Sequence, residues 1–244
     1  MPRFFVDKEA VSQGEIVISG ADAHHIARSL RMAEGDTLTV CDSSGKEYHS
    51  TLTRIRDEEC ICRIDEICES MTEPPYHITL YMAYPKGDKL ETVIQKAVEL
   101  GATEIVPFES SRCIKRPNAE KEDKQTARLQ RIAEEAAKQC GRAKIPEVTR
   151  SVSFKEMLSL AKCATLPLLC YESEDGRSIK DEIKGNRPES IALIVGCEGG
   201  FSPDEVALAK ESGIISVSLG RRILRCETAP LYALAAISYE LELS

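Results

Sequence analysis

Hydrophobic and polar positions alternate along the first 70 residues with the two-residue period of β-strands. This alternation predicts short strands at residues 3–6, 15–18, 37–41, 47–56 and 60–67. Between the second and third runs, the segment ADAHHIARSLRM predicts one helix, with Ile26 and Leu30 on the same face. The segment DSSGKE is a turn signal that joins two strands. Residues 36–68 therefore read as a β-meander that closes a small barrel.

The pattern changes after a linker at residues 70–76, which contains Pro74 and Pro75. From His77 onward, apolar strand-like runs alternate with helical patterns, including a long basic helix from about residue 120 to 140. The helix after Gly87 is the clearest, because its apolar residues recur at helical spacing and Gly101 ends it: Leu90, Val93, Ile94, Ala97 and Val98. Such alternation is typical of βαβ units with a mainly parallel sheet. The predicted fold class is α/β, with domains at residues 1–72 and 73–244.

Composition narrows the class of protein. The 244 residues are 42% hydrophobic, which supplies a core for one large or two modest domains. No apolar run reaches the length of a membrane helix, and the first ten residues lack the apolar centre of a signal peptide, so we expect a cytoplasmic protein without membrane contact. The ten cysteines are scattered and form no CxxC pair, so we expect reduced thiols and no metal site.

The charge distribution bears on a nucleic-acid partner. The net charge of -8 is unfavourable for contact with phosphates, which usually requires lysine and arginine. Residues 112–150, however, contain eleven Lys or Arg against six Asp or Glu, and Arg221, Arg222 and Arg225 form a second basic group. These segments are either solvated helix faces or RNA contacts.

Three predicted strands in the second half are followed by unusual loops, at residues 168–172, 194–205 and 218–230. Because ligands bind at the carboxyl ends of parallel strands, these loops are expected to line one crevice. In the middle loop, glycines at 196, 199 and 200 allow close approach of the backbone to a ligand, and Ser202 with Glu205 predicts a capping box.

Competing motifs are absent from the sequence. It contains no G-x-G-x-x-G motif of dinucleotide-binding sites and no G-x-x-x-x-G-K-[ST] motif of nucleoside-triphosphate sites. It also contains no G-x-S-x-G motif of serine hydrolases. The sequence therefore does not favour any of these three kinds of site. The four histidines all fall in the first domain or at its border, which makes histidine catalysis in the crevice unexpected.

The segments HHIARSLRM, KQCGR, VGCEGGFS and LGRRILRCETAPLYAL resemble the ribosomal small-subunit RNA uridine-N3 methyltransferases (RsmE type) of the SPOUT superfamily. The resemblance covers essentially the whole chain. It implies an N-terminal PUA-like β-barrel, a SPOUT α/β domain with a C-terminal trefoil knot, and a homodimer. It also implies S-adenosyl-L-methionine as cofactor and 16S ribosomal RNA, within the small ribosomal subunit, as substrate.

By position, the resemblance also implies which residues bind the cofactor: Leu169, Tyr171, Gly196, Gly199, Leu219, Gly220, Leu224 and Arg225. The sequence departs from the family at Cys197, where GPEGG is usual, and the loss of proline makes that turn less preorganised. An apolar slot of Leu219, Ile223 and Leu224 suits an adenine ring, although plain core packing explains such residues equally well.

Methylation at N3 of uridine requires loss of a proton, which leaves negative charge on the ring carbonyls. We expect Arg142 and Arg225 to stabilise this charge or orient the base, and Glu227 or Glu198 to accept the proton. In the alternative interpretation, Arg142 caps the preceding helix and Glu227 pairs with Arg221 or Arg222.

Basic residues of both domains are expected to contact RNA: Arg3, Arg28, Arg31, Arg112, Lys115 and Arg116. Arg28 and Arg31, three positions apart, would present two guanidinium groups on one helix face.

Two other functions remain open from sequence. One is ribose 2′-O methylation with the same cofactor, and the other is a non-catalytic RNA-binding assembly factor. The apolar face of the last helix, with Leu231, Leu234, Ile237 and Leu241, serves either a dimer seam or the internal core.

Overall fold

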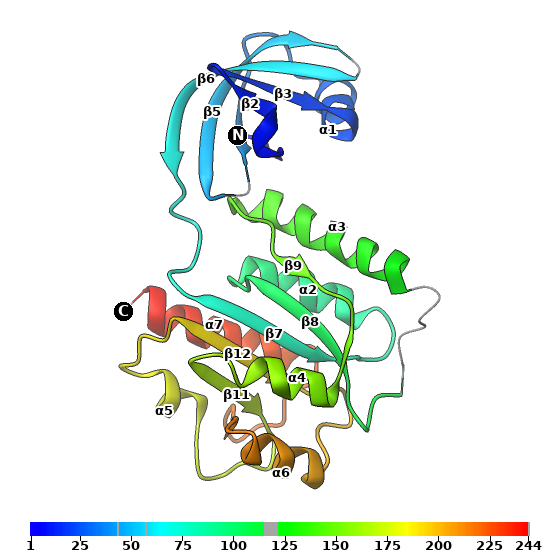
Figure 1. The fold of residues 1–244 in the computed structure, drawn as a ribbon, viewed down its shortest axis with the longest axis vertical. Coiled ribbons are helices and arrows are strands. Elements are labelled where there is room, and N and C mark those ends of the chain that lie inside the picture. Colours follow the sequence, from blue (N-terminus) through cyan, green and yellow to red (C-terminus); the bar gives the residue numbers. More distant parts are fainter. Residues whose placement is uncertain (43, 57, 115–121, 244) are drawn as a thin grey trace. The chain divides into compact units, whose positions relative to one another are not determined.

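The computed structural model describes residues 1–42, 44–56, 58–114 and 122–243, and these form two compact units. The first unit comprises Met1–Glu73 and Ala137–Ile145, and the second comprises Pro74–Ala136 and Pro146–Ser244. In Figure 1 the chain of the first unit begins in dark blue and runs to cyan, and its second segment is green. The segment 137–145 belongs to the first unit by its contacts, whereas the linear pattern assigned it to the second domain.

The first unit is built on a six-stranded sheet with the order β1-β4-β5-β6-β3-β2. Its strands are β1 (Arg3–Phe5), β2 (Val11–Ser12), β3 (Glu15–Ser19), β4 (Thr37–Cys41), β5 (Lys46–Ile55) and β6 (Glu59–Glu69). Only β1 and β4 pair in parallel; the other neighbours are antiparallel. The sheet is curled as a half-barrel. Its edge strands β1 and β2 do not pair with each other in the described residues, so the sheet does not close into the predicted barrel.

Alternating residues of these strands fill the core of the first unit, among them Phe4, Ile16, Leu38 and Leu52. The helical segments are a 3-10 turn (Lys8–Ala10), α1 (Gly20–His24) and a π-helical turn (His25–Ser29).

The predicted face of the first helix is partly wrong. Ile26 is buried as expected, but Leu30 is 41% exposed and Arg31 has a φ of 51°. The π-turn explains this, because the amide of Leu30 bonds the carbonyl of His25 five residues back and changes the helical phase. The helix ends at Ser29, so Arg28 and Arg31 do not share one of its faces.

The second unit contains a parallel sheet with the order β10-β8-β7-β12-β11-β13, and β9 also pairs with β8. Its strands are β7 (His77–Ala83), β8 (Glu104–Glu109), β9 (Glu147–Val148), β10 (Val152–Ser153), β11 (Leu166–Cys170), β12 (Ser190–Val195) and β13 (Ile215–Val217). Every pair in the sheet is parallel, which confirms the predicted βαβ organisation. The near-continuous apolar strands β11 and β12 suit a sheet that is buried on both faces.

The helices are α2 (Lys89–Glu99), α3 (Glu122–Cys140), α4 (Phe154–Ala161), α5 (Ile179–Ile183), α6 (Pro203–Glu211) and α7 (Thr228–Glu242). Helix α2 buries the five apolar residues that the sequence predicted. Helix α7 packs against α2, α5 and β12, and buries Leu234, Ile237 and Leu241 inside the unit. Leu231, the fourth residue of the predicted apolar face, is only half-buried. Three of the four residues of this face therefore serve the internal core. No helix of the described residues is long and apolar enough to cross a bilayer.

The strand register aligns the carboxyl ends of the sheet. Cys170, the last residue of β11, lies beside Val195 of β12 and Val217 of β13. Val195 in turn lies beside Met82 of β7. The chain therefore leaves four neighbouring strands at the same edge.

Candidate functional site

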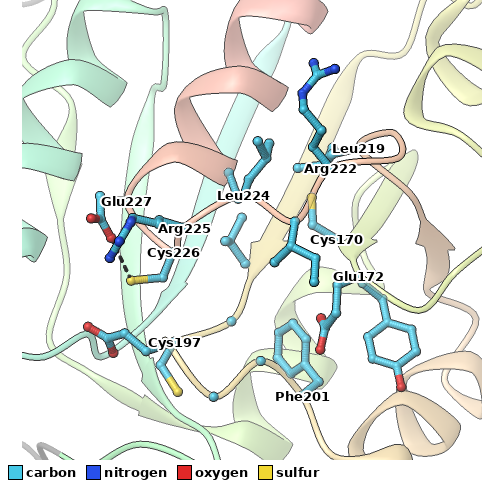
Figure 2. A pocket seen from close by; sticks show the side chains of 18 of the residues that line it. Cys170, Glu172, Cys197, Phe201, Leu219, Arg222, Leu224, Arg225, Cys226 and Glu227 are labelled. Atoms are coloured by element: carbon cyan, nitrogen blue, oxygen red, sulfur yellow. Dashed lines mark hydrogen bonds between the residues drawn. The ribbon is translucent and has the colours of Figure 1, made fainter.

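A cavity of about 410 Å³ lies at this edge of the second unit. Figure 2 shows its side chains, which come from the ends of β11 and β12 and from the segment between β13 and α7. The lining residues extend over 170–172, 195–201 and 218–227, together with Lys89 and Ala229. The three loops that the sequence singled out thus meet at one cavity.

The glycine loop, residues 196–200, is packed too closely for larger residues. A Cβ atom on Gly196 would lie 3.2 Å from the backbone of Gly200 and 3.2 Å from the ring of Phe201. On Gly199 it would lie 3.0 Å from Cβ of Arg112, and on Gly200 it would lie 2.6 Å from Oε1 of Glu172. Gly200 also has a φ of +63°, which favours glycine. The loop therefore presents main chain to the cavity.

Side chains from three other segments fix this loop. The ring of Phe201 stacks on Phe108 of β8 at a centroid distance of 6.4 Å. Arg112 donates from Nη1 to the carbonyl of Gly199 at 2.7 Å. The predicted capping box is confirmed, since Ser202 and Glu205 bond each other's backbone at the start of α6. Buried Glu205 also accepts from the amide of Ser111 at 2.7 Å, which joins the loop after β8 to the glycine loop.

The third loop combines a glycine turn with an exposed apolar side chain. Gly220 has a φ of +110° and donates its amide to the Ser218 hydroxyl at 3.1 Å. Ile223 lines the cavity and is 86% exposed, whereas Leu224 is half-buried. An exposed isoleucine at a cavity is a surface that an apolar ligand can cover.

Charged residues of both signs line the cavity, four basic and three acidic: Lys89, Arg221, Arg222, Arg225, Glu172, Glu198 and Glu227. Nζ of Lys89 lies 3.0 Å from Oε1 of Glu198 and 3.1 Å from Oε2 of Glu227. Glu198 also accepts from the amide of Lys86 at 3.0 Å.

These contacts shift the pKa values of Lys89, Glu198 and Glu227, which form one charged cluster at the cavity. Burial alone would raise the pKa of Glu198, but hydrogen bonds from its own amide, Lys89 and Lys86 hold that pKa below its ordinary value. Hydrogen bonds from its own amide, Cys226 and Lys89 likewise lower the pKa of Glu227. The carboxylates of Glu198 and Glu227 raise the pKa of Lys89.

Three cysteines also line the cavity, namely Cys170, Cys197 and Cys226. Sγ of Cys226 lies 3.2 Å from Oε2 of Glu227, drawn as a dashed line in Figure 2, and burial followed by this contact raises its pKa to about 12. Cys197 lies near Cys113, with the hydroxyl of Ser110 3.9 Å and 3.5 Å from the two sulfur atoms. A hydrogen bond from Cys113 lowers the pKa of Cys197.

The sequence matches the family model of an RNA methyltransferase domain over residues 72–238 and that of an RNA methyltransferase PUA domain over residues 18–65. It is 36% identical to ribosomal RNA small subunit methyltransferase E of Bacillus subtilis (strain 168), over 100% of this chain and 98% of that protein. The chain belongs to the ribosomal RNA small subunit methyltransferase E family.

Two further members of the methyltransferase E family support this assignment. The protein of that name from Synechocystis sp. is 34% identical over 98% of this chain and 78% of its own length. The crystal structure of the Neisseria gonorrhoeae methyltransferase E bound to S-adenosyl methionine has a TM-score of 0.87 and 31% identity, covering 98% of this chain and 97% of that chain.

Most residues that the resemblance to methyltransferase E assigned to cofactor binding line the cavity: Tyr171, Gly196, Gly199, Leu219, Gly220, Leu224 and Arg225. Leu169 does not; it lies within β11 and is fully buried in the sheet. Its neighbour Cys170 lines the cavity instead, because side chains alternate along a strand. Three of the four residues expected in catalysis also line it, namely Arg225, Glu198 and Glu227.

Two arginines of the first unit are held by ion pairs. Arg142 is buried and pairs with Glu73, with 2.7 Å between Nη2 and Oε2, and it is not among the residues that line the cavity. Arg3 pairs with Glu47 at 2.9 Å, and its side chain is only 13% exposed.

The other residues expected to contact RNA differ in their surroundings. Arg28 and Arg31 are exposed, and Arg112 contacts the glycine loop. Lys115 and Arg116 lie outside the described residues.

Sequence reasoning missed Lys89 and Glu172. Glu172 lies two residues after the end of β11, in one of the three predicted loops, so its position in the sequence could have predicted that it lines the cavity. Lys89 follows β7, and only the pairing of β7 with β12 brings its helix to the same edge.

One group of possible metal ligands occurs in the described residues. His49, Glu66 and Cys68 of the first unit bring one ligand atom each within 4.8 Å of one another. Glu66 is exposed and the other two are half-buried. Exposed groups of this kind commonly gather without an ion, so no metal is assigned.

Proposed function

We propose that this chain is an S-adenosylmethionine-dependent methyltransferase that methylates N3 of a uridine in 16S ribosomal RNA. The observation that carries the proposal is the meeting of three loops, after β11, β12 and β13, around one cavity at the carboxyl edge of the parallel sheet. The names of its relatives, which describe small-subunit ribosomal RNA methyltransferases, and the cofactor bound to the Neisseria gonorrhoeae relative support it.

The residues of the cavity fit this cofactor. Its volume lies within the range of about 300–1,000 Å³ that is usual for small-molecule sites. The exposed side chain of Ile223, with Leu219 and Leu224, offers an apolar surface for an adenine ring. Gly196, Gly199 and Gly200 offer main-chain groups to a ligand, because these residues have no Cβ atom. Tyr171 and Gly220 also line the cavity and are included among the proposed binding residues. The bound cofactor would supply an electrophilic methyl group on a sulfonium.

The side chains at the cavity would position the base and balance its charge. The guanidinium of Arg225 presents planar paired donors, so it suits the oxygen atoms of a uridine ring that has lost its N3 proton. Methyl transfer needs an in-line approach, and most of the rate enhancement should come from holding the base beside the methyl group. Glu198 and Glu227 are the candidate proton acceptors at the cavity, and their lowered pKa values weaken them as bases.

RNA contact is assigned to the first unit, which matches the PUA family model, and to Arg112 at the glycine loop. Arg28 and Arg31 are exposed and suit phosphate contacts, whereas the guanidinium of Arg3 is held by Glu47. The segment with Lys115 and Arg116 completes the candidate RNA residues by resemblance to the family.

Further features follow from the family resemblance alone. We include in the proposal a PUA-like first domain, a C-terminal trefoil knot in a SPOUT domain, a homodimer, a cytoplasmic location and a substrate within the small ribosomal subunit. Buried Leu234 and Ile237 support the core role of α7 and leave any dimer seam to other residues of the chain.

Calorimetric titration with S-adenosylmethionine tests the proposal against a non-catalytic assembly factor. We expect one binding event per chain and transfer of labelled methyl groups to small ribosomal subunits. A titration without heat, together with tight RNA binding, would favour the assembly factor. Methyl groups on ribose would favour 2′-O methylation.

A further inference from the structure

Lys89 connects two carboxylates that are far apart in the sequence. Lys89 begins α2, Glu198 lies in the glycine loop, and Glu227 precedes α7. Its ammonium group lies within 3.1 Å of an oxygen of each carboxylate, and all three side chains line the cavity. One lysine therefore links the segment after β7 to the glycine loop and to the loop between β13 and α7.

Each of the two carboxylates already accepts hydrogen bonds from neighbouring groups of the protein. Glu198 accepts from Lys89 and from the amide of Lys86, and Glu227 accepts from Lys89 and from the thiol of Cys226. Their pKa values lie below the ordinary glutamate value, so both stay ionised at neutral pH. A carboxylate that is ionised and bonded in this way is a weak base.

The charges of the cluster do not cancel. The pKa of Lys89 is raised, so one ammonium group stands between two carboxylates, and these three side chains together carry a net negative charge at one side of the cavity. Negative charge favours a sulfonium cation near it. Without the ammonium group, two neighbouring carboxylates would repel each other, and one of them would take up a proton more readily.

We propose that Lys89 is a positioning residue of the methyl-transfer site. It holds Glu198 and Glu227 in place as ionised groups that attract the sulfonium, and thereby removes both from the role of proton acceptor. The N3 proton is then lost to solvent water. This inference rests on the proposed function, and it replaces the expectation from sequence that one of these glutamates accepts the N3 proton.

The other titratable groups at the cavity allow the effect of Lys89 to be isolated. They are Tyr171, Glu172, Cys197, Arg221, Arg222, Arg225 and Cys226. Among the described lining residues, Glu172 is the only further carboxylate, and the carboxylate partners of Lys89 there are Glu198 and Glu227. A change in the acid range after substitution of Lys89 therefore reports on Glu198 and Glu227.

The experiment compares wild type with Lys89→Met, Lys89→Arg and the control Lys96→Met. Lys96 lies on the same helix and pairs with Glu99 away from the cavity. Steady-state methyl transfer to small ribosomal subunits is measured from about pH 3 to 8, so that the range includes the lowered pKa values of both glutamates, and cofactor affinity is measured by calorimetry over the same range. If the methionine variant does not fold, Lys89→Gln takes its place.

We expect Lys89→Met to lower kcat/KM for the cofactor roughly 100-fold and to move the acid limb of the profile up by about one pH unit. Lys89→Arg should restore most activity and the wild-type limb, and Lys96→Met should match wild type. An unchanged acid limb in Lys89→Met, or equal losses in the arginine and methionine variants, would overturn the inference. A wild-type protein that binds no cofactor would reject the proposed function as well.

Discussion

The guanidinium of Arg142 and the carboxylate of Glu73 form a buried ion pair, with 2.7 Å between Nη2 and Oε2 and side chains only 4% and 14% exposed. Oε1 of Glu73 also accepts from the amides of Ala143 and Lys144 at 3.0 Å each. The pair thus ties the returning segment 137–145 to the end of the first 73 residues. This geometry assigns Arg142 a structural role within the first unit.

Removal of one partner of this pair should destabilise the first unit. Arg142→Ala leaves an unpaired buried carboxylate and should lower the free energy of unfolding by about 3 kcal/mol. Glu73→Ala removes the carboxylate that neutralises this buried guanidinium and should also lower the free energy of unfolding. Urea denaturation followed by circular dichroism measures both. If Arg142→Ala is as stable as wild type and yet inactive, Arg142 acts in catalysis and the structural assignment is wrong.

The glycine loop should not tolerate a single added methyl group. In Gly196→Ala the new Cβ would lie 3.2 Å from the backbone of Gly200 and the ring of Phe201, neither of which can move freely. We expect cofactor affinity to fall at least tenfold in calorimetry. Gly185→Ala is the matched control, because Gly185 has a φ of +73° and no neighbour within 4 Å. It should lose about 1 kcal/mol of stability without loss of affinity, and equal affinities of the two variants would contradict the packing argument.

Low pH should lower the free energy of unfolding of the first unit, in part because the carboxylate of Asp42 becomes protonated. Burial favours the neutral form of this carboxyl, but hydrogen bonds from the hydroxyl and amide of Ser44 and from the hydroxyl of Tyr48 lower its pKa. Because the pKa is lower in the folded state, Asp42 stabilises the fold above about pH 4 and loses this contribution as the pH falls through the lowered pKa. Asp42→Asn should therefore cost about 1–2 kcal/mol at pH 7 and much less at pH 3. Equal costs at both pH values, measured by urea denaturation, would exclude this carboxylate as a source of acid sensitivity.

Substitution of two arginines of the first unit should have different effects, on RNA affinity in one case and on stability in the other. Arg31 is exposed, so Arg31→Ala should weaken RNA binding and reduce the slope of log affinity against log salt by about 1. Arg3 is held by Glu47, so Arg3→Ala should instead lower stability. Affinity at several salt concentrations checks both variants, with exposed Arg187→Ala of the second unit as control. A salt slope that stays the same in Arg31→Ala would remove Arg31 from the phosphate contacts.

Periodicity predicted helix α2 because this helix buries a single face. The five apolar residues of α2 recur at helical spacing, and all five are buried. The loops after β11, β12 and β13 were predicted to meet because parallel strands end at the same edge, and their register confirms this. The same reasoning failed at Leu30 and Arg31, because a π-turn shifts the helical phase and no sequence period reveals it.

The remaining features depend on contacts between distant segments. Lys89 reaches Glu198 only because β7 pairs with β12, which follows it by more than 100 residues. Arg142 pairs with Glu73 because segment 137–145 returns to the first unit. Local patterns carry no information on either pairing, so the sequence predicted neither of these two contacts.

Mass spectrometry of nuclease-digested small-subunit RNA, after reaction with methyl-labelled S-adenosylmethionine, tests the central claim most directly. If the cavity holds the cofactor beside N3 of a uridine, the label appears in a nucleoside methylated on the uracil ring, and Gly196→Ala removes it. Label on ribose, or no label from a protein that binds the RNA, would contradict the account.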